Sequence, residues 1–153
     1  MRIDEAEETV YQILAQNWSL TPLAWHNVDA RNYTLPGQPL LPDGTEDYLA
    51  VRLDIHAATT LTVPGHCIRY AGQLSIGICV KERTGTRQAK LYLSELADLL
   101  ENQRLISEHG TLMVSPLSNQ GDYFAENGWY VLEAAFPIHF ERYLVPGRVE
   151  VTS

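Results

Sequence analysis

The side chains best suited to chemistry in this chain are two cysteines and five histidines. Cys67 follows His66 at an expected turn, and Cys79 lies on the strand-like run that comes next. A thiol beside an imidazole could act as a nucleophile, and one Cys with two His could hold zinc. No C-x-x-C or other metal-binding spacing supports this grouping, and the remaining histidines are dispersed: His26, His56, His109 and His139. We therefore favour a structural interpretation, in which Cys79 is a small strand residue and His66 belongs to a turn.

No established catalytic motif occurs in the chain. The phosphate-binding strings G-x-x-x-x-G-K-[ST] and G-x-G-x-x-G are absent, as are G-x-S-x-G and H-E-x-x-H. Glu46, Asp47 and Asp54 could perform acid–base work if they converged in a cleft, but solvated charge is the usual state of such residues. Trp129 and Tyr130 could stack on a base or sugar, although aromatic residues that open a strand more often pack. The sequence thus predicts no catalytic residue, no cofactor and no metal.

Length, composition and charge narrow the class of protein. The 153 residues fit one domain, and 45% apolar with 20% charged residues is typical of a globular fold. Eleven Lys and Arg against nineteen Asp and Glu give a net charge of −8, which disfavours sequence-specific DNA binding because few cations can neutralise phosphates. Two cysteines fit a reducing compartment. The acidic N-terminus and the lack of a long apolar run predict a soluble protein without a standard signal or membrane segment.

Hydropathy patterns predict two helices and several strands. Apolar residues recur at helical spacing over 4–18 and 89–103, with Asp4 expected to cap the first helix. Alternation predicts strands over 48–56, 68–80, 111–114 and 129–140, with a closing piece at 148–151. Prolines and glycines predict a long ordered loop or arm at about 19–45, and 115–128 is expected to be a polar loop.

The order of these elements predicts the fold class. It lacks the βαβαβ regularity of a parallel sheet. We therefore predict a single compact α+β domain over residues 1–153, with a mainly antiparallel sheet flanked by two helices.

Charge is unevenly distributed along the chain. Residues 1–54 hold nine acidic and three basic residues, whereas five basic residues and one acidic residue lie between Arg69 and Lys90. In a ring built by head-to-tail contacts, such a basic segment would face an acidic surface of the next copy. This makes Lys81, Arg83 and Arg87 candidate subunit-interface residues. The alternative is a solvated hairpin tip, and the sequence leaves both interpretations open.

Several short motifs occur in an order that resembles a known family. Their order along the chain is Asn32-Tyr33 in the proline-bearing loop, Tyr48-Leu49-Ala50-Val51, Tyr70-x-Gly72, Gly85 before the second helix, and Gly128-Trp129-Tyr130. With the N-terminal helix, this order is similar to that of the tail terminator (tail-tube capping, minor tail protein) family of long-tailed bacteriophages. The resemblance covers most of the chain and depends on order and spacing, because each motif is short.

The resemblance implies a structural virion protein without catalytic activity. Such a protein forms a hexameric ring on the tail tube, stops tube polymerisation and provides the surface on which the head docks. Its partners would be other copies of itself, the tail tube protein and a head completion or connector protein, with no membrane. DNA would pass through the ring without specific binding, and part of the −8 charge would face that lumen. The location would be the head-proximal end of the tail, after assembly in the host cytoplasm.

Two other classes remain as alternatives. One is another head–tail joining or tube-like assembly protein, which would share the size, the acidity and the lack of catalysis. The other is a small hydrolase or metal enzyme built around Cys67 and the histidines. The isolated chain could also be a monomer until a tube supplies a template.

Overall fold

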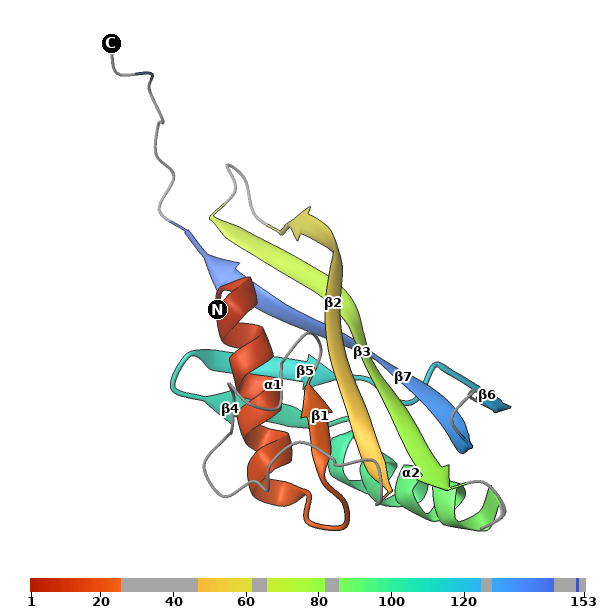
Figure 1. Cartoon of the computed structure of the whole chain (residues 1–153). Helices are drawn as coiled ribbons and strands as arrows, with labels where there is room; N and C mark the ends of the chain where they lie inside the picture. The colour runs from red at the N-terminus through yellow and green to blue at the C-terminus, as the bar shows by residue number, and fades with distance from the viewer. Residues whose placement is uncertain (26–46, 62–65, 82–85, 125–127, 145–150, 152–153) are drawn as a thin grey trace.

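The computed structural model describes residues 1–25, 47–61, 66–81, 86–124, 128–144 and 151 (Figure 1). The elements are α1 (Ile3–Asn17), β1 (Leu23–Trp25), β2 (Tyr48–Thr60), β3 (Cys67–Lys81), α2 (Thr86–Leu100), β4 (Arg104–Ser107), β5 (Gly110–Val114), β6 (Asn119–Phe124) and β7 (Trp129–Tyr143). All seven strands form one sheet in the order β1-β2-β3-β7-β5-β4, and β6 pairs with β7 beside β5. Neither of the described helices, at 15 residues each, is long and apolar enough to cross a membrane.

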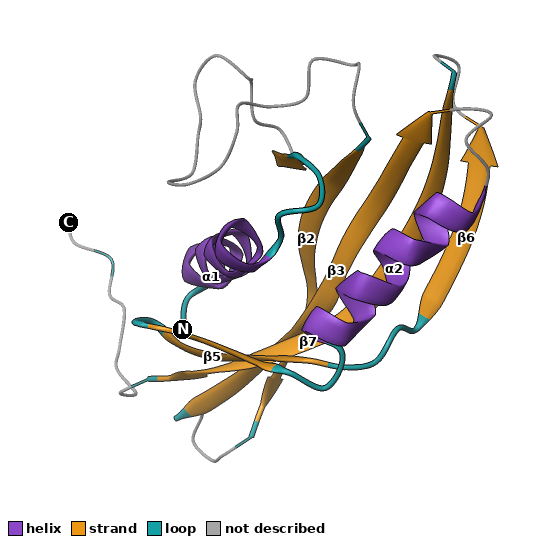
Figure 2. Cartoon of the chain, turned by 90° about the horizontal axis from the view of Figure 1, so that it is seen from below, coloured by secondary structure: helices purple, strands orange, loops and turns teal. Residues whose placement is uncertain are grey.

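The prediction of a mainly antiparallel sheet flanked by two helices is wrong. Strands dominate the described residues, and the sheet is mixed because β1 runs parallel to β2. The sheet also curls into a half-barrel, and both helices lie on its inner face (Figure 2). Hydropathy patterns specify which side of each strand is apolar. They do not specify how far long twisted strands coil.

The core lies between the inner face of the sheet and the two helices. β3 and β7 pair antiparallel along their whole length, and this register sets Leu74 opposite Phe136 and Ile78 opposite Leu132. Every second residue of both strands therefore points to the same face, as the alternation requires. The helices cover this face with small, branched and aromatic side chains, all buried: Ala6, Val10, Leu14, Ala89, Tyr92, Leu96 and Leu100.

The N-cap of the first helix is Arg2, two residues before the expected cap, Asp4. The backbone N–H of Arg2 donates to Glu5 Oε1 at 2.7 Å, which is one half of a capping box. Asp4 lies inside the first turn and pairs with Arg2 Nε at 3.2 Å, so the prediction that Asp4 caps the helix is wrong. The Asp4 carboxylate still lies at the N-terminal end of α1, where the helix dipole favours negative charge.

The two helices and the strands over 48–56, 68–80, 111–114 and 129–140 are confirmed, and all four strands are longer than expected. The prediction of a polar loop over 115–128 is wrong in part, because β6 forms inside this range. Strands β1 and β4 were not predicted. Residues 26–45 of the expected arm and 148–150 of the expected closing piece lie outside the described residues.

A bulge in β2 depends on one glycine of β3. The β2–β3 register shifts between Ile55 and Ala57, opposite Gly72. A Cβ atom at Gly72 would overlap the backbone carbonyl oxygen of Asp54. The two strands therefore approach closely only because this position has no side chain.

We expect Gly72→Ala to lower the free energy of unfolding by roughly 2–3 kcal/mol, because the backbone of β2 must move to make room. Gly77→Ala in the same strand is the matched control, since its Cβ would meet no described atom closer than 3.6 Å and should change stability by less than about 0.5 kcal/mol. Urea denaturation measures both. Equal effects of the two substitutions would contradict this account of the bulge.

Candidate functional site

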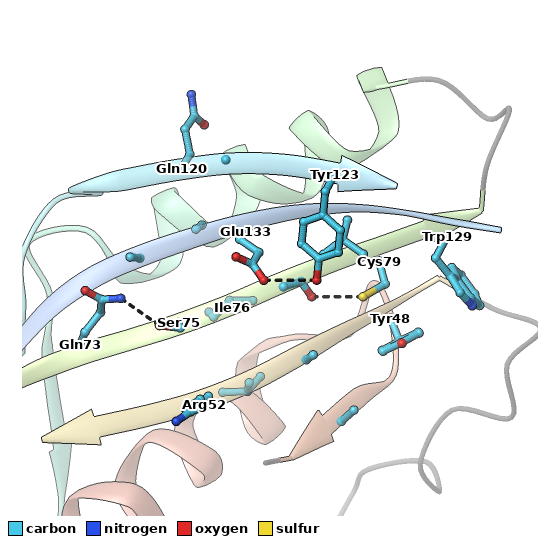
Figure 3. A pocket seen from close by; sticks show the side chains of 18 of the residues that line it. Tyr48, Arg52, Gln73, Ser75, Ile76, Cys79, Gln120, Tyr123, Trp129 and Glu133 are labelled. Atoms are coloured by element: carbon cyan, nitrogen blue, oxygen red, sulfur yellow. Dashed lines mark hydrogen bonds between the residues drawn. The ribbon is translucent and has the colours of Figure 1, made fainter. Parts of the chain in front are cut away.

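The outer face of the sheet carries a groove that no described helix covers. The groove encloses about 920 Å³ and lies over β2, β3, β6 and β7, and in Figure 3 the helices lie behind the sheet. We call it the open-face groove and define it by its polar and aromatic lining: Tyr48, Arg52, Gln73, Cys79, Tyr123, Trp129 and Glu133. These residues alternate with the core residues on the same strands.

Small residues make the groove hollow. Strand register sets Ala50, Gly77 and Glu133 in one row across β2, β3 and β7. Ala50 and Gly77 are small, and the next row, which contains Arg52, adds the small residues Ser75 and Ala135. Because larger residues surround these rows, the centre of the face is lower than its rim.

One end of the groove holds a cluster of protonated hydroxyl and thiol groups around a carboxylate. The Tyr123 hydroxyl donates to Glu133 Oε1 at 3.3 Å, and the Cys79 thiol donates to the Gly77 carbonyl oxygen at 3.7 Å (Figure 3). The ring of Tyr48 meets that of Trp129 edge to face, with ring centres 5.3 Å apart.

The surroundings keep these groups neutral. Burial, with the nearby Cys79, raises the pKa of Tyr48 to about 12. Burial also raises the pKa of the Cys79 thiol, and burial together with the Glu133 charge raises that of Tyr123. At neutral pH the cluster therefore offers hydroxyl and thiol donors and one carboxylate acceptor, but no thiolate nucleophile.

The charges of the groove are only partly balanced. Arg52 Nε lies 2.8 Å from Asp54 Oδ2, so these two side chains neutralise each other. Glu133 is exposed and forms no ion pair within the described part of the chain. A basic side chain from another molecule would find an acceptor there, next to two aromatic rings.

The two cysteines of the alternative Cys and His grouping lie far apart in the structure. Cys67 and Cys79 lie near opposite ends of β3, separated by about 40 Å of strand at 3.3 Å per residue. His66 lies in an exposed bend, His56 is exposed on β2, and His26 is outside the described residues. A nucleophile or zinc site that uses both cysteines is therefore excluded by their separation.

The candidate interface residues stay a prediction. Lys81 is the last residue of β3, exposed, and its backbone N–H donates to Asp47 Oδ1 at 3.2 Å. Arg87 is exposed in the first turn of α2, and Arg83 lies outside the described residues. Lys81 pairs in register with Trp129, which places it beside the aromatic end of the open-face groove.

Sequence reasoning missed this groove. Alternation along β2 and β3 sets Arg52, Ser75 and Cys79 on the side opposite the core residues, and all three line the groove. The sequence had no signal for β6, whose residues Asn119–Phe124 show no apolar alternation. Without β6, the Tyr123–Glu133 contact that closes one side of the groove could not be foreseen.

Comparisons with known proteins inform the fold alone. No protein-family model matches the chain, and no curated protein matches it. One solved structure superposes on it with a TM-score of 0.62 at 17% sequence identity, over 92% of this chain and 98% of the other. This similarity shows that the fold occurs elsewhere.

We expect both thiols of the folded protein to react with a thiol reagent at pH 7 at least about tenfold more slowly than a free cysteine. Cys67 and Cys79 are 4% and 5% exposed, and the thiolate of Cys79 is disfavoured. Both should react once guanidinium unfolds the chain, and Cys79→Ala assigns any residual rate to Cys67. Rapid labelling of Cys79 in the folded state would instead support a catalytic thiol.

Proposed function

We propose that the chain is a structural assembly protein of the tail-terminator type. Copies of it pack side by side into a ring that caps a phage tail tube, stops its growth and receives the head. The motif order described above supports the family, and the surfaces described below support self-assembly.

The observation that carries the proposal is the outer edge of β6. Along one side β6 pairs with β7, and along the other side it pairs with no strand among the described residues. Tyr123 is 48% and Phe124 is 68% exposed on this strand, which contains neither Lys nor Pro. Soluble proteins normally protect sheet edges with Lys or Pro, because an open edge pairs with other chains. An aromatic edge beside a hollow face suits addition of a strand or arm from a neighbour.

The distribution of charge supports contacts between unlike surfaces. Lys81 and Arg87 lie at the end of the molecule where α2 begins, whereas α1 lies on the opposite side and exposes Asp4 and Glu7 (Figure 1). Contacts between unlike patches generate rings when the rotation closes. In such a ring the basic end of one copy faces α1 of the next, as the charge pattern of the sequence predicts.

The remaining parts of the proposal follow from the resemblance. The ring would bind the tail tube protein on one side and a head completion or connector protein on the other, within the virion. Part of the −8 charge would line the lumen, where it would repel passing DNA and prevent its retention. Another head–tail joining protein would use the same surfaces, so the cap on the tube is the distinguishing property.

We expect Phe124→Ser to weaken self-association by about tenfold or more, because a buried aromatic anchor typically contributes over 1 kcal/mol to an interface. Sedimentation equilibrium over a range of concentrations measures this effect. Tyr143→Ser is the control, since Tyr143 is 75% exposed at the other end of β7. Unchanged assembly of Phe124→Ser, or a wild type that stays monomeric even with tail tubes present, would contradict the proposal.

A further inference from the structure

A second cluster of polar side chains lies where α1 meets the β4–β5 hairpin. His109 occupies the turn between the two strands, and its backbone N–H donates to the Ser107 hydroxyl at 3.1 Å. That hydroxyl also lies 2.8 Å from the hydroxyl of Thr9, a buried residue of α1. The turn and the helix are thus fixed against each other, and the His109 side chain lies beside the first turns of α1.

One nitrogen of the His109 ring is held by a carboxylate. Nδ1 lies 2.9 Å from Glu5 Oε2, while Glu5 Oε1 accepts the backbone N–H of Arg2 at 2.7 Å. Glu5 is therefore fixed through both of its oxygens. A carboxylate that accepts the Nδ1 proton leaves a lone pair on Nε2, which is how histidine ligands are commonly oriented towards a metal.

The other nitrogen faces two further carboxylates. Nε2 lies 3.2 Å from Glu8 Oε2 and 3.5 Å from Glu108 Oε1. This nitrogen is buried, yet it has no hydrogen-bond partner among the described residues. Glu8 is oriented by Gln12, whose side-chain amide donates to Glu8 Oε1 at 3.1 Å. An imidazole nitrogen this close to two carboxylates must carry either a proton or a bound cation, because its bare lone pair would be repelled by their charges.

We propose that Glu8, Glu108 and His109 bind a divalent first-row cation of the Zn²⁺ type. Their three ligand atoms all lie within 4.8 Å of one another. Two atoms bound to one tetrahedral zinc at about 2.0–2.2 Å lie about 3.3–3.6 Å apart, close to the two measured separations. One imidazole with two carboxylates suits Zn²⁺ better than Mg²⁺, and water supplies the fourth ligand.

The bound cation connects two distant parts of the sequence. Glu8 comes from α1, whereas Glu108 and His109 come from the hairpin. The cation therefore pins the N-terminal helix to the edge of the sheet. The two carboxylates are 49% and 78% exposed, which gives the ion a path from solvent. This site lies on α1 and the hairpin, away from the open-face groove, and a single chain supplies all three ligands. In the proposed ring, α1 is also the surface that faces the next copy.

Titration of the purified full chain with Zn²⁺ tests the proposal. We expect one Zn²⁺ per chain by calorimetry, and a rise in Tm of about 5–10 °C when free Zn²⁺ is 100 times its Kd. Co²⁺ should give the visible absorption of a tetrahedral N/O site, and Mg²⁺ at the same concentration should leave Tm unchanged. Glu8→Gln and His109→Gln should each weaken Zn²⁺ binding by about tenfold or more.

The matched control is Glu7→Gln, which removes a neighbouring exposed carboxylate of α1 that does not face His109 and should bind as wild type does. Circular dichroism checks that each variant is folded, and Glu8 is exposed enough for its variant to fold. The proposal is overturned if the wild type binds no Zn²⁺, as expected if Nε2 simply carries a proton. It is also overturned if Glu8→Gln binds Zn²⁺ as tightly as Glu7→Gln does.

Discussion

The antiparallel pairing of β3 with β7 is the constraint on which the rest of this structure depends. Their register runs unbroken from Cys67 opposite Tyr143 to Lys81 opposite Trp129. Every other strand joins this pair directly or through one neighbour, because β2 occupies the free edge of β3 while β5 and β6 share that of β7. A register slip by one residue would turn Phe136 outward and Glu133 inward, so core and groove are set by the same pairing.

Covering only one face of the sheet has a functional consequence. Both helices pack on the inner face, so the outer face must be stabilised by small or paired side chains such as Ala50, Gly77 and the Arg52–Asp54 pair. The aromatic residues at its rim and the open edge of β6 are then available to other molecules. This division fits a protein whose work is assembly, since one layer maintains the fold and the other supplies contacts.

The sequence predicted those parts of the fold that local patterns control. The helices and the long strands follow from periodicity, and outward residues such as Ser75 and Cys79 follow from alternation. The parallel pairing of β1, the curl of the sheet and the strand β6 depend on tertiary contacts that leave little local signal. The same dependence on tertiary contacts decides which reactive side chains lie close together. Cys67 and Cys79 are near in sequence yet lie far apart on an extended strand, whereas Glu8 meets His109 across a hundred residues.

Electron microscopy of tail tubes can show whether this protein caps them. Purified tube protein is polymerised with and without this chain, and tube lengths and ends are measured after negative staining. We expect tubes that carry a ring of this protein at one end and stop growing once it is bound. Tubes of unchanged length with bare ends would contradict the proposal, and the open-face groove would then need another partner.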